Sequence, residues 1–344
     1  MSFKRLDPED ISISAESIVT PVWSTNALTL TNSQFWTSSA QVAAGTGDFY
    51  YKVYNKDINT DSTATPQFAV AFGDRTGRGA APYTAGVSGK SSTSTVYGQY
   101  RSLIYGDEDT AFTFQGQTSD YIYVITLDRA RYREKLLPGT FNLTLGLAGQ
   151  TNKINLTDNS NTVSTVSYVD AGRIYDIISG SNGVPYTAGK TGLNAQGGSY
   201  GKFLPDVGII ILNGMALTAS LGPDGGIALP ITVVTTKPNF SNPLHFFTSM
   251  KIGGSFKLQC EETVSSNYIF VRVRNSEFNY STNPSNITGS GELRHDVMVN
   301  SPQGYITTVG LYNDNNDLLA VAKLSRPLLK DFTKEALIRI KLDY

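Results

Sequence analysis

Two triplets in the chain match the end of a phosphate-binding loop. Gly89-Lys90-Ser91 and Gly189-Lys190-Thr191 carry the glycine, the lysine and the hydroxyl that hold a nucleotide phosphate in such loops. A complete loop has another glycine five positions before the glycine of the triplet, and a helix follows it. Thr84 and Val184 stand at that place, and no helix is expected after either triplet. Nucleotide binding is therefore not expected.

A second motif, Gly197-Gly198-Ser199-Tyr200-Gly201, matches the letters of a nucleophile elbow. That chemistry needs the serine on a sharp turn from a strand into a helix, with a histidine within reach. Ser199 instead lies in a glycine-rich run, and the whole chain holds two histidines, His245 and His295. We interpret Ser199 as a loop residue.

The remaining candidates for chemistry are His295 and the acidic runs. Two histidines and one cysteine cannot form a Cys/His zinc cluster, so His295 beside Asp296 would need distant ligands. The run Asp107 to Asp109 lacks the ligand spacing of a calcium loop, so a solvated turn is favoured. Glu261 and Glu262 are neighbours on an expected strand and would point to opposite faces. We expect no catalytic residue, no metal and no cofactor.

Charge and composition exclude some partners. The chain has 28 basic and 29 acidic residues, so it has no overall field that would attract it to nucleic acid or to an anionic membrane. Only 17% of the residues are charged, whereas there are 19 Tyr and 16 Phe. Two interpretations stay open: surfaces that neighbouring subunits cover, or an ordinary β-sandwich with polar loops.

Two observations bear on the compartment. Cys260 is the single cysteine, so no disulfide forms within the chain, which agrees with assembly in a reducing cytoplasm. The N-terminal residues are charged where a secretory signal has an apolar core, so no signal peptide is expected. The most apolar run, Val207 to Leu212, is too short to cross a bilayer and predicts a buried strand.

Short apolar runs separated by turn residues predict an all-β fold of β-sandwich or jelly-roll-like modules. One short helix is expected near residues 128–137, where Asp128 is placed as an N-cap and Pro138 ends the run. The expected organisation is an N-terminal arm, a β domain with Gly/Ser-rich insertions and a C-terminal β domain, at residues 1–30, 31–240 and 241–344.

The glycine-rich spans also suggest an internal repeat. Pro82 to Gly86 recurs as Pro185 to Gly189, and Tyr97 to Tyr100 is answered by Tyr200 to Phe203 at the same offset of 103 residues. Two matches in one register are the basis for the hypothesis of a degenerate duplication. Unrelated backbone paths in the two segments would reject it.

The last forty residues contain the clearest strand signals. Residues 305–312 and 318–324 are β-branched, aromatic or apolar, and the polar residues 313–317 lie between them, which predicts an antiparallel hairpin. A break is expected at Ser325-Arg326-Pro327. Residues 338–344 then alternate between apolar and charged side chains, as in a half-buried strand, so the chain is expected to end inside a sheet.

Within this hairpin, Val309-Gly310-Leu311-Tyr312, a polar turn with Asp314 and the run Leu319-Ala320-Val321-Ala322 resemble a hairpin of tail-fibre and baseplate-attached proteins of contractile-tailed bacteriophages. Longer stretches resemble a virion structural protein of myoviruses, including those of marine cyanobacteria. These are YGQYRSLIYGDEDTAF, SDYIYVITLDRARYREKLLPGTFNLTL, VRVRNSEFNYSTNPS and GELRHDV. The resemblance implies a virion subunit associated with the tail or baseplate and transfers no catalytic residue.

We therefore expect a non-enzymatic structural subunit, assembled into the virion in the host cytoplasm. Its expected partners are other phage structural proteins and copies of itself, with no nucleic acid and no membrane. A receptor- or glycan-binding tail protein, with a host surface glycan as ligand, and a capsid decoration or neck protein remain as alternatives. In fibres the hairpin lies toward the N-terminus, whereas here it lies near the C-terminus, which favours a compact adaptor.

Two groups of residues are candidates for subunit contacts. The hairpin supplies the first group, for which core packing is an equally good interpretation: Val309, Gly310, Leu311, Tyr312, Leu319, Ala320 and Val321. The second group is Arg129, Arg131 and Arg133 on the expected helix, which would face either an acidic neighbour or solvent.

Overall fold

The computed structural model describes residues 3–37, 50–79, 91–186, 199–220, 225–233 and 241–343. Most of the regular structure is β-strand, and the described residues contain three α-helices, so the all-β prediction is confirmed. The chain forms two compact units. Unit 1 consists of Met1–Ser17 and Thr263–Tyr344, and unit 2 is Ile18–Glu262. Each unit is described separately.

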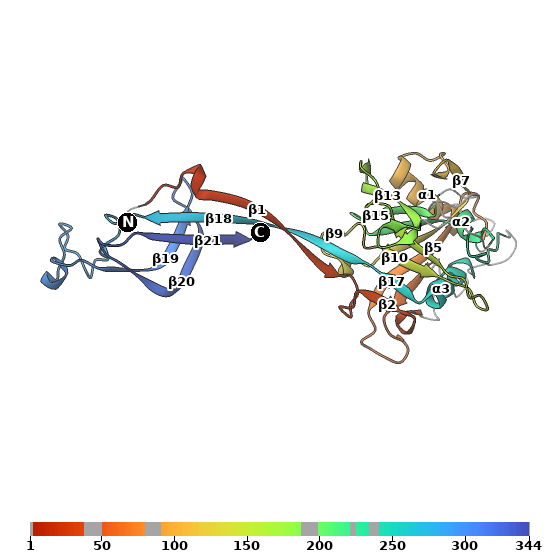
Figure 1. Cartoon of the computed structure of the whole chain (residues 1–344), viewed down its shortest axis with the longest axis horizontal. Helices are drawn as coiled ribbons and strands as arrows, with labels where there is room; N and C mark the ends of the chain where they lie inside the picture. The colour runs from red at the N-terminus through yellow and green to blue at the C-terminus, as the bar shows by residue number, and fades with distance from the viewer. Residues whose placement is uncertain are drawn as a thin grey trace, which may run out of the picture. The chain divides into compact units, whose positions relative to one another are not determined.

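One long antiparallel sheet forms the body of unit 2 (Figure 1). Its strands follow the order β2 (Thr29–Thr31), β17 (Ser255–Lys257), β10 (Asn142–Leu145), β11 (Ile154–Asp158), β13 (Gly172–Ser181), β15 (Gly201–Leu204), β16 (Ile209–Asn213), β8 (Tyr121–Leu127), β5 (Pro66–Asp74), β4 (Tyr50–Tyr54) and β3 (Trp36–Thr37). The end strands β2 and β3 are separated in the chain only by residues 32–35, which reach at most about 17 Å. The sheet therefore curls until its two ends come close together.

Both faces of the middle of this sheet are buried. In β8, Tyr123, Ile125 and Leu127 point into the larger hydrophobic cluster, whereas Ile122 and Val124 belong to a second cluster on the opposite face. Successive side chains of a strand point to opposite faces, so a strand buried on both sides is apolar throughout. This explains the apolar residues of β8 and β16, and it confirms the prediction of a buried strand at Val207 to Leu212.

The three helices of unit 2 cover these faces or lie beside them. Helix α1 (Ser92–Tyr105) supplies Tyr97 and Ile104 to the second cluster, and α3 (Ser241–Gly253) supplies Phe246 and Met250 to the larger one. Helix α2 (Gly214–Thr218) follows β16 directly. The short strands β6 (Phe112–Phe114), β7 (Gln117–Ser119), β12 (Ser167–Val169) and β14 (Val184–Pro185) complete the unit.

The helix expected at residues 128–137 is not present. Asp128 does cap a helical turn, since its side chain accepts a hydrogen bond from the backbone N–H of Ala130, but this is a single 3-10 turn, η4 (Arg129–Arg131). Residues of β9 (Lys135–Leu136) pair instead with β18 at Cys260 and Glu261. The backbone groups that a longer helix would use are therefore taken by a strand ladder.

The helices α1 and α3 were not expected, because the sequence predicted a single short helix, near residues 128–137. The hypothesis of a duplication fails because Tyr97 to Tyr100 lies inside α1 whereas Tyr200 to Phe203 leads into the strand β15. The first half of the repeat, 82–86, lies outside the described residues, as do residues 187–189 of its counterpart.

Unit 1 contains two small sheets (Figure 1). Strand β18 (Gln259–Val273) lies between β1 (Ile11–Pro21) and β21 (Ala336–Asp343), and β19 (Gly304–Tyr312) pairs with β20 (Leu318–Lys330). Two 3-10 turns, η1 (Pro8–Asp10) and η5 (Asp296–Met298), lie in the connecting segments. Ile269, Ile338 and Ile340 form the centre of the hydrophobic core of this unit.

The unit boundaries fall inside β1 and β18 and differ from the expected division at residues 30 and 240. Residues 241–262 belong to unit 2 because α3 lies against its sheet and β17 pairs with β10 and β2. In the same way Trp23 and Leu30, within the expected arm, are buried in the core of unit 2.

The C-terminal strands agree largely with expectation. The hairpin and its loop at residues 313–317 are confirmed, and Ile338 and Ile340 of β21 are buried while Arg339 and Lys341 are exposed. The expected break at Ser325-Arg326-Pro327 is wrong, since β20 continues to Lys330. The backbone stays extended there and the ladder shifts its register instead.

Candidate interaction surface

The β19–β20 hairpin holds most of the residues that were predicted to make contacts. Its antiparallel ladder is interrupted by irregularities between Ile306 and Thr308 and between Leu311 and Tyr312. Between them the register is regular: Val309 lies opposite Ala322, Gly310 opposite Val321, and Leu311 opposite Ala320. Side chains that face each other across an antiparallel ladder lie on the same side of the sheet. The register therefore sorts the predicted residues into two faces.

The inner face belongs to the core of unit 1. Val309 and Leu311 are half-buried and pack, with Ala322, against the cluster of Ile269, Ile338 and Ile340. Ala320, opposite Leu311, is half-buried as well. For Val309, Leu311 and Ala320 the core-packing interpretation therefore holds.

The outer face is apolar and exposed. Leu319 is 67% exposed, Val321 is 58% exposed and Tyr312 is 39% exposed. Leu318, which pairs with Tyr312, is also exposed. We call Gly310, Tyr312, Leu318, Leu319 and Val321 the hairpin outer face. This set contains four of the seven hairpin residues predicted from the sequence and adds Leu318.

Gly310 has a specific place in this surface. A Cβ atom on Gly310 would lie 2.9 Å from Cε2 of Tyr312 and 3.4 Å from Cδ1 of Leu318. The tyrosine ring therefore lies over the glycine backbone, in the space that a side chain would fill. An aromatic ring that covers a glycine in a neighbouring strand position protects its backbone from water. The ring of Tyr312 therefore contacts the glycine backbone.

Phe3 extends the surface from a distant part of the chain. Its ring centroid lies 5.2 Å from that of Tyr312 in an edge-to-face arrangement, and Phe3 is 60% exposed. The contact joins the first described residue of the chain to the hairpin. Edge-to-face pairs of this kind contribute roughly 0.5–1.5 kcal/mol beyond the area that they bury.

This arrangement suits binding to another molecule. The members of the hairpin outer face carry no charge, and the only polar group of its side chains is the phenol of Tyr312. Exposed apolar patches on a folded protein usually mark a place where another molecule binds. The charged residues nearest to this surface in the sequence include Asp317, directly before Leu318, and Lys323, two positions beyond Val321.

The three arginines of the second predicted group do not form a shared surface. Arg129 stacks on the ring of Tyr132, with its guanidinium carbon 4.7 Å from the ring centroid, and Arg131 is half-buried. Arg133 is exposed and forms an ion pair with Glu262, which raises the pKa of the Arg133 guanidinium. Arg129 and Arg133 thus have partners within unit 2, whereas the buried Nε of Arg131 has no hydrogen-bond partner.

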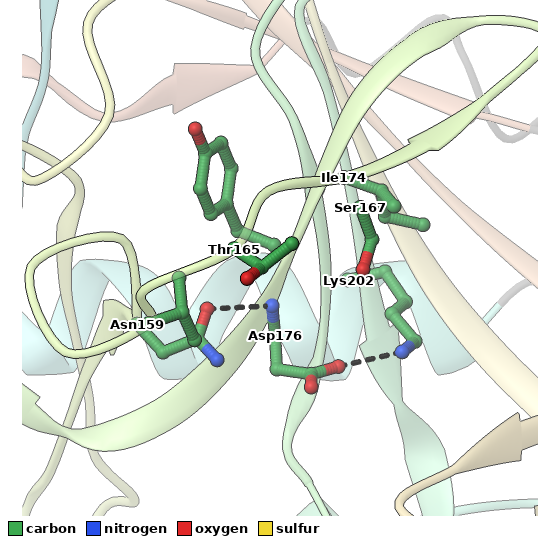
Figure 2. Close-up of a pocket in the computed structure, with 8 residues that line it drawn as sticks. Asn159, Thr165, Ser167, Ile174, Asp176 and Lys202 are labelled. Atoms are coloured by element: carbon green, nitrogen blue, oxygen red, sulfur yellow. Dashed lines mark hydrogen bonds and ion pairs between the residues drawn. The ribbon is translucent and has the colours of Figure 1, made fainter.

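A shallow pocket of about 80 Å³ is present in unit 2. It is lined by Asn159, Val163, Thr165, Ser167, Ile174, Tyr175, Asp176 and Lys202. Figure 2 shows the Asp176 carboxylate pointing at Lys202, and Nζ of Lys202 lies 2.6 Å from Oδ1 of Asp176. The backbone N–H of Asp176 donates to Oδ1 of Asn159. The side-chain amide of Gln115 donates to the other carboxylate oxygen. These polar groups are already bonded to one another.

Ser199 and His245 each contact a backbone carbonyl of unit 2. Ser199 is buried, and its hydroxyl donates to the carbonyl of Gly201 at the start of β15, so no helix follows it. Nδ1 of His245 lies 3.1 Å from the carbonyl of Pro230, and His295 is exposed at the start of η5. Gly197 and Gly198 lie outside the described residues. The elbow interpretation is thereby rejected on the fold around Ser199.

The first phosphate-loop triplet differs from expectation in one respect, because a helix does follow it. Ser91 is the N-cap of α1 and accepts the backbone N–H of Ser94, while its hydroxyl donates to the carbonyl of Gly77. The hydroxyl is therefore engaged in capping. Gly89 and Lys90 lie outside the described residues, as does the second triplet, Gly189-Lys190-Thr191.

The acidic candidates are held in turns and ion pairs. The Asp107 carboxylate accepts hydrogen bonds from the backbone N–H groups of Asp109 and Thr110. The hydroxyl of Thr110, together with these N–H groups, lowers the pKa of the Asp107 carboxyl. Glu261 and Glu262 face Lys135 and Arg133. Among the described residues no three His, Cys, Asp or Glu side chains gather closely enough to hold a metal ion. Within the same ranges, no helix has the length and apolarity to cross a membrane.

Sequence reasoning missed Phe3 and Leu318. Leu318 directly follows the loop, and its exposure depends on the irregularity between Leu311 and Tyr312, for which the sequence has no clear signal. Phe3 contacts Tyr312 across almost the whole length of the chain. No local pattern could predict that contact.

Comparison of the chain with protein-family models, with curated proteins and with solved structures found no match.

Proposed function

We propose that this chain is a structural subunit of a contractile-tailed phage virion, associated with the tail or baseplate, and that it acts through contacts between subunits. The resemblance of the C-terminal hairpin and of longer stretches to virion proteins supports the virion assignment. The hairpin outer face supports the mode of action, and it is the observation that carries the proposal. Its residues are apolar, exposed and held in place by a paired ladder.

Association would bury the side chains of Leu319, Val321 and Tyr312 on the outer face. Fully burying an aliphatic or aromatic side chain stabilises a complex by about 1.5–3 kcal/mol, and tyrosine is frequent among the residues that dominate binding energy. The ladder fixes these side chains before binding, so little conformational entropy is lost. A preformed apolar surface on a rigid hairpin is suited to a permanent contact in a particle.

The direct test is the location of the protein. Purified particles of the phage that encodes the chain are analysed by mass spectrometry, and the copy is located in a density map of the virion. The protein is expected in mature particles, in the tail or baseplate. Recovery of the chain only as free protein from infected cells would overturn the proposal, as would turnover of a polysaccharide or a small molecule by the purified chain.

A further inference from the structure

The balance of buried and exposed apolar side chains in unit 1 is unusual for a stable fold. Among its described residues four large apolar side chains are buried: Ile269, Val273, Ile338 and Ile340. Fifteen are exposed: Phe3, Ile11, Ile13, Phe278, Tyr280, Val297, Met298, Val299, Tyr305, Tyr312, Leu318, Leu319, Val321, Phe332 and Leu337. In unit 2 the larger hydrophobic cluster and the second cluster contain most of the large apolar residues. Unit 1 therefore has little core of its own.

Folded units with a small core need additional stabilisation, from disulfides, a structural metal or oligomerisation. Unit 1 contains no cysteine, since Cys260 belongs to unit 2. The described part of the unit has no group of side chains that could bind a metal ion. Of these three means of stabilisation, association with another chain is the one that the residues of unit 1 support.

The exposed apolar residues lie on several surfaces. Ile11 and Ile13 alternate on β1, Leu319 and Val321 lie on the hairpin outer face, and Val297 to Val299 lie in and after η5. One small ligand or one docked peptide would cover only one of these surfaces. Neighbours that contact the unit from more than one side, as in a homo-oligomer, would cover several of them.

Charge hardly opposes contact between identical units. Unit 1 has 11 Lys and Arg residues against 12 Asp and Glu, a net charge of −1, so two copies repel each other only weakly. The hairpin outer face has no charge with which to select a charged partner. An uncharged apolar face also meets an identical face without a like-charge penalty.

We infer that copies of this chain associate with one another through unit 1, with the hairpin outer face at the contact. The inference rests on the proposed function, because the same face serves in both. The partner that binds the hairpin outer face is, on this inference, a second copy of the chain. The strand edges of unit 1 allow further pairing: within the described residues β21 pairs only with β18, so its other edge has unpaired backbone groups.

The test measures the mass of the full-length chain by native mass spectrometry and by light scattering at micromolar concentration. The wild-type protein is expected at a multiple of 37.2 kDa. A double variant, Leu319→Asp with Val321→Asp, is expected to shift to the monomer mass, with association weakened at least tenfold. The matched control is Val184→Asp in unit 2, because Val184 is 57% exposed and Val321 is 58% exposed. The control is expected to keep the wild-type mass.

Hydrogen exchange keeps the test decisive if the double variant folds poorly. On dilution of the wild-type protein, residues 304–330 should exchange faster while the sheet of unit 2 keeps its protection. A wild-type chain that stays at 37.2 kDa, or exchange that does not change on dilution, would overturn the inference. A monomeric chain found in mature particles would overturn it and leave the proposed function standing. An oligomer that is absent from particles would support the inference and overturn the proposed function.

Discussion

Nζ of Lys330 lies 2.6 Å from Oδ1 of Asn279, and both side chains are buried in unit 1. The same ammonium group donates to the backbone carbonyls of Asn275 and Asp331. All three of its protons therefore have an oxygen acceptor, and no carboxylate is among them. Lys330 in this way fixes the turn after β18, where Phe278 has a φ of 50°. One buried cation joins the end of β20 to that turn.

Lys330→Met is expected to destabilise unit 1 by about 3 kcal/mol, because buried acceptors lose a charged donor. Hydrogen exchange of residues 263–343 measures the effect without relying on unit 2. The matched control is Lys323→Met, an exposed lysine on the same strand, which should change protection by less than about 0.5 kcal/mol. Equal behaviour of the two variants would contradict the role given to Lys330.

Arg173 and Asp206 predict a dependence of stability on pH in unit 2. The Arg173 backbone N–H donates to Asp206 Oδ2, and its Nη2 lies 2.6 Å from Oδ1. Burial raises the pKa of Asp206, but the hydrogen bonds from Arg173 outweigh burial and hold it below the ordinary value of 3.8. The Asp206 carboxyl therefore binds its proton more tightly in the unfolded chain than in the folded chain. The stabilisation is complete above the unfolded pKa and is lost as pH falls through the folded pKa.

Asp206→Asn should accordingly lower the free energy of unfolding by about 2 kcal/mol at neutral pH and by progressively less below about pH 4. Denaturant unfolding at a series of pH values measures this difference. Glu108→Gln, which changes an exposed carboxyl in a turn, serves as the control and should leave the curve unchanged. A loss of stability in Asp206→Asn that is the same at acid and neutral pH would show that the ion pair is not its source.

Two glycines test the packing of α1 on the sheet. Gly98 lies inside the helix, and a Cβ there would meet nothing within 4 Å. Gly98→Ala is expected to stabilise unit 2 by about 1 kcal/mol, since alanine favours the helix. A Cβ on Gly73 of β5 would lie 2.8 Å from the backbone nitrogen of Tyr97, so Gly73→Ala should cost about 1–3 kcal/mol. Thermal unfolding measures both. The two substitutions are expected to change the free energy of unfolding in opposite directions. Equal changes would contradict the packing of α1 against Gly73.

The strands that were predicted correctly carry their signal in neighbouring residues. The apolar run at 207–212 and the alternation around Ile338 and Ile340 are local consequences of burial on two faces or on one. The hairpin was predictable for the same reason, with its polar loop between two apolar runs. In each case the sequence pattern and the strand ladder extend over the same few residues.

Helix α1 shows why other elements were missed. Its Val96, Tyr97 and Tyr100 favour strands, and Gly98 weakens a helix. The opposing signal was the spacing of its buried residues, Thr93, Tyr97, Arg101 and Ile104, between an N-cap serine and Gly106 at φ 69°. That spacing follows one helix face. Packing of Tyr97 against the sheet decides between the two patterns, and packing is not visible in composition.

The interaction surface was predictable only in part. The hairpin could be found, but whether Leu311 or Tyr312 faces outward depends on the irregularity between them and on which side meets the core of unit 1. A shift of one residue moves every side chain to the other face. The long-range contact of Phe3 with Tyr312 adds a part of the surface that no window of the sequence contains.

Tyr312 is the residue of the hairpin outer face whose loss should weaken association most. Its ring lies over Gly310 and against Phe3, so it is ordered before a partner arrives. Tyr312→Ala is expected to weaken association of the chain at least tenfold, or about 1.4 kcal/mol, as measured by the concentration dependence of its mass. Gly310→Ala should have a smaller effect in the same direction, because the added Cβ displaces the ring while a single side chain can still adjust.

The matched control is Tyr168→Ala, an exposed tyrosine of unit 2, which should associate like the wild-type chain. Association that survives in Tyr312→Ala and is lost in Tyr168→Ala would move the contact from the hairpin to unit 2.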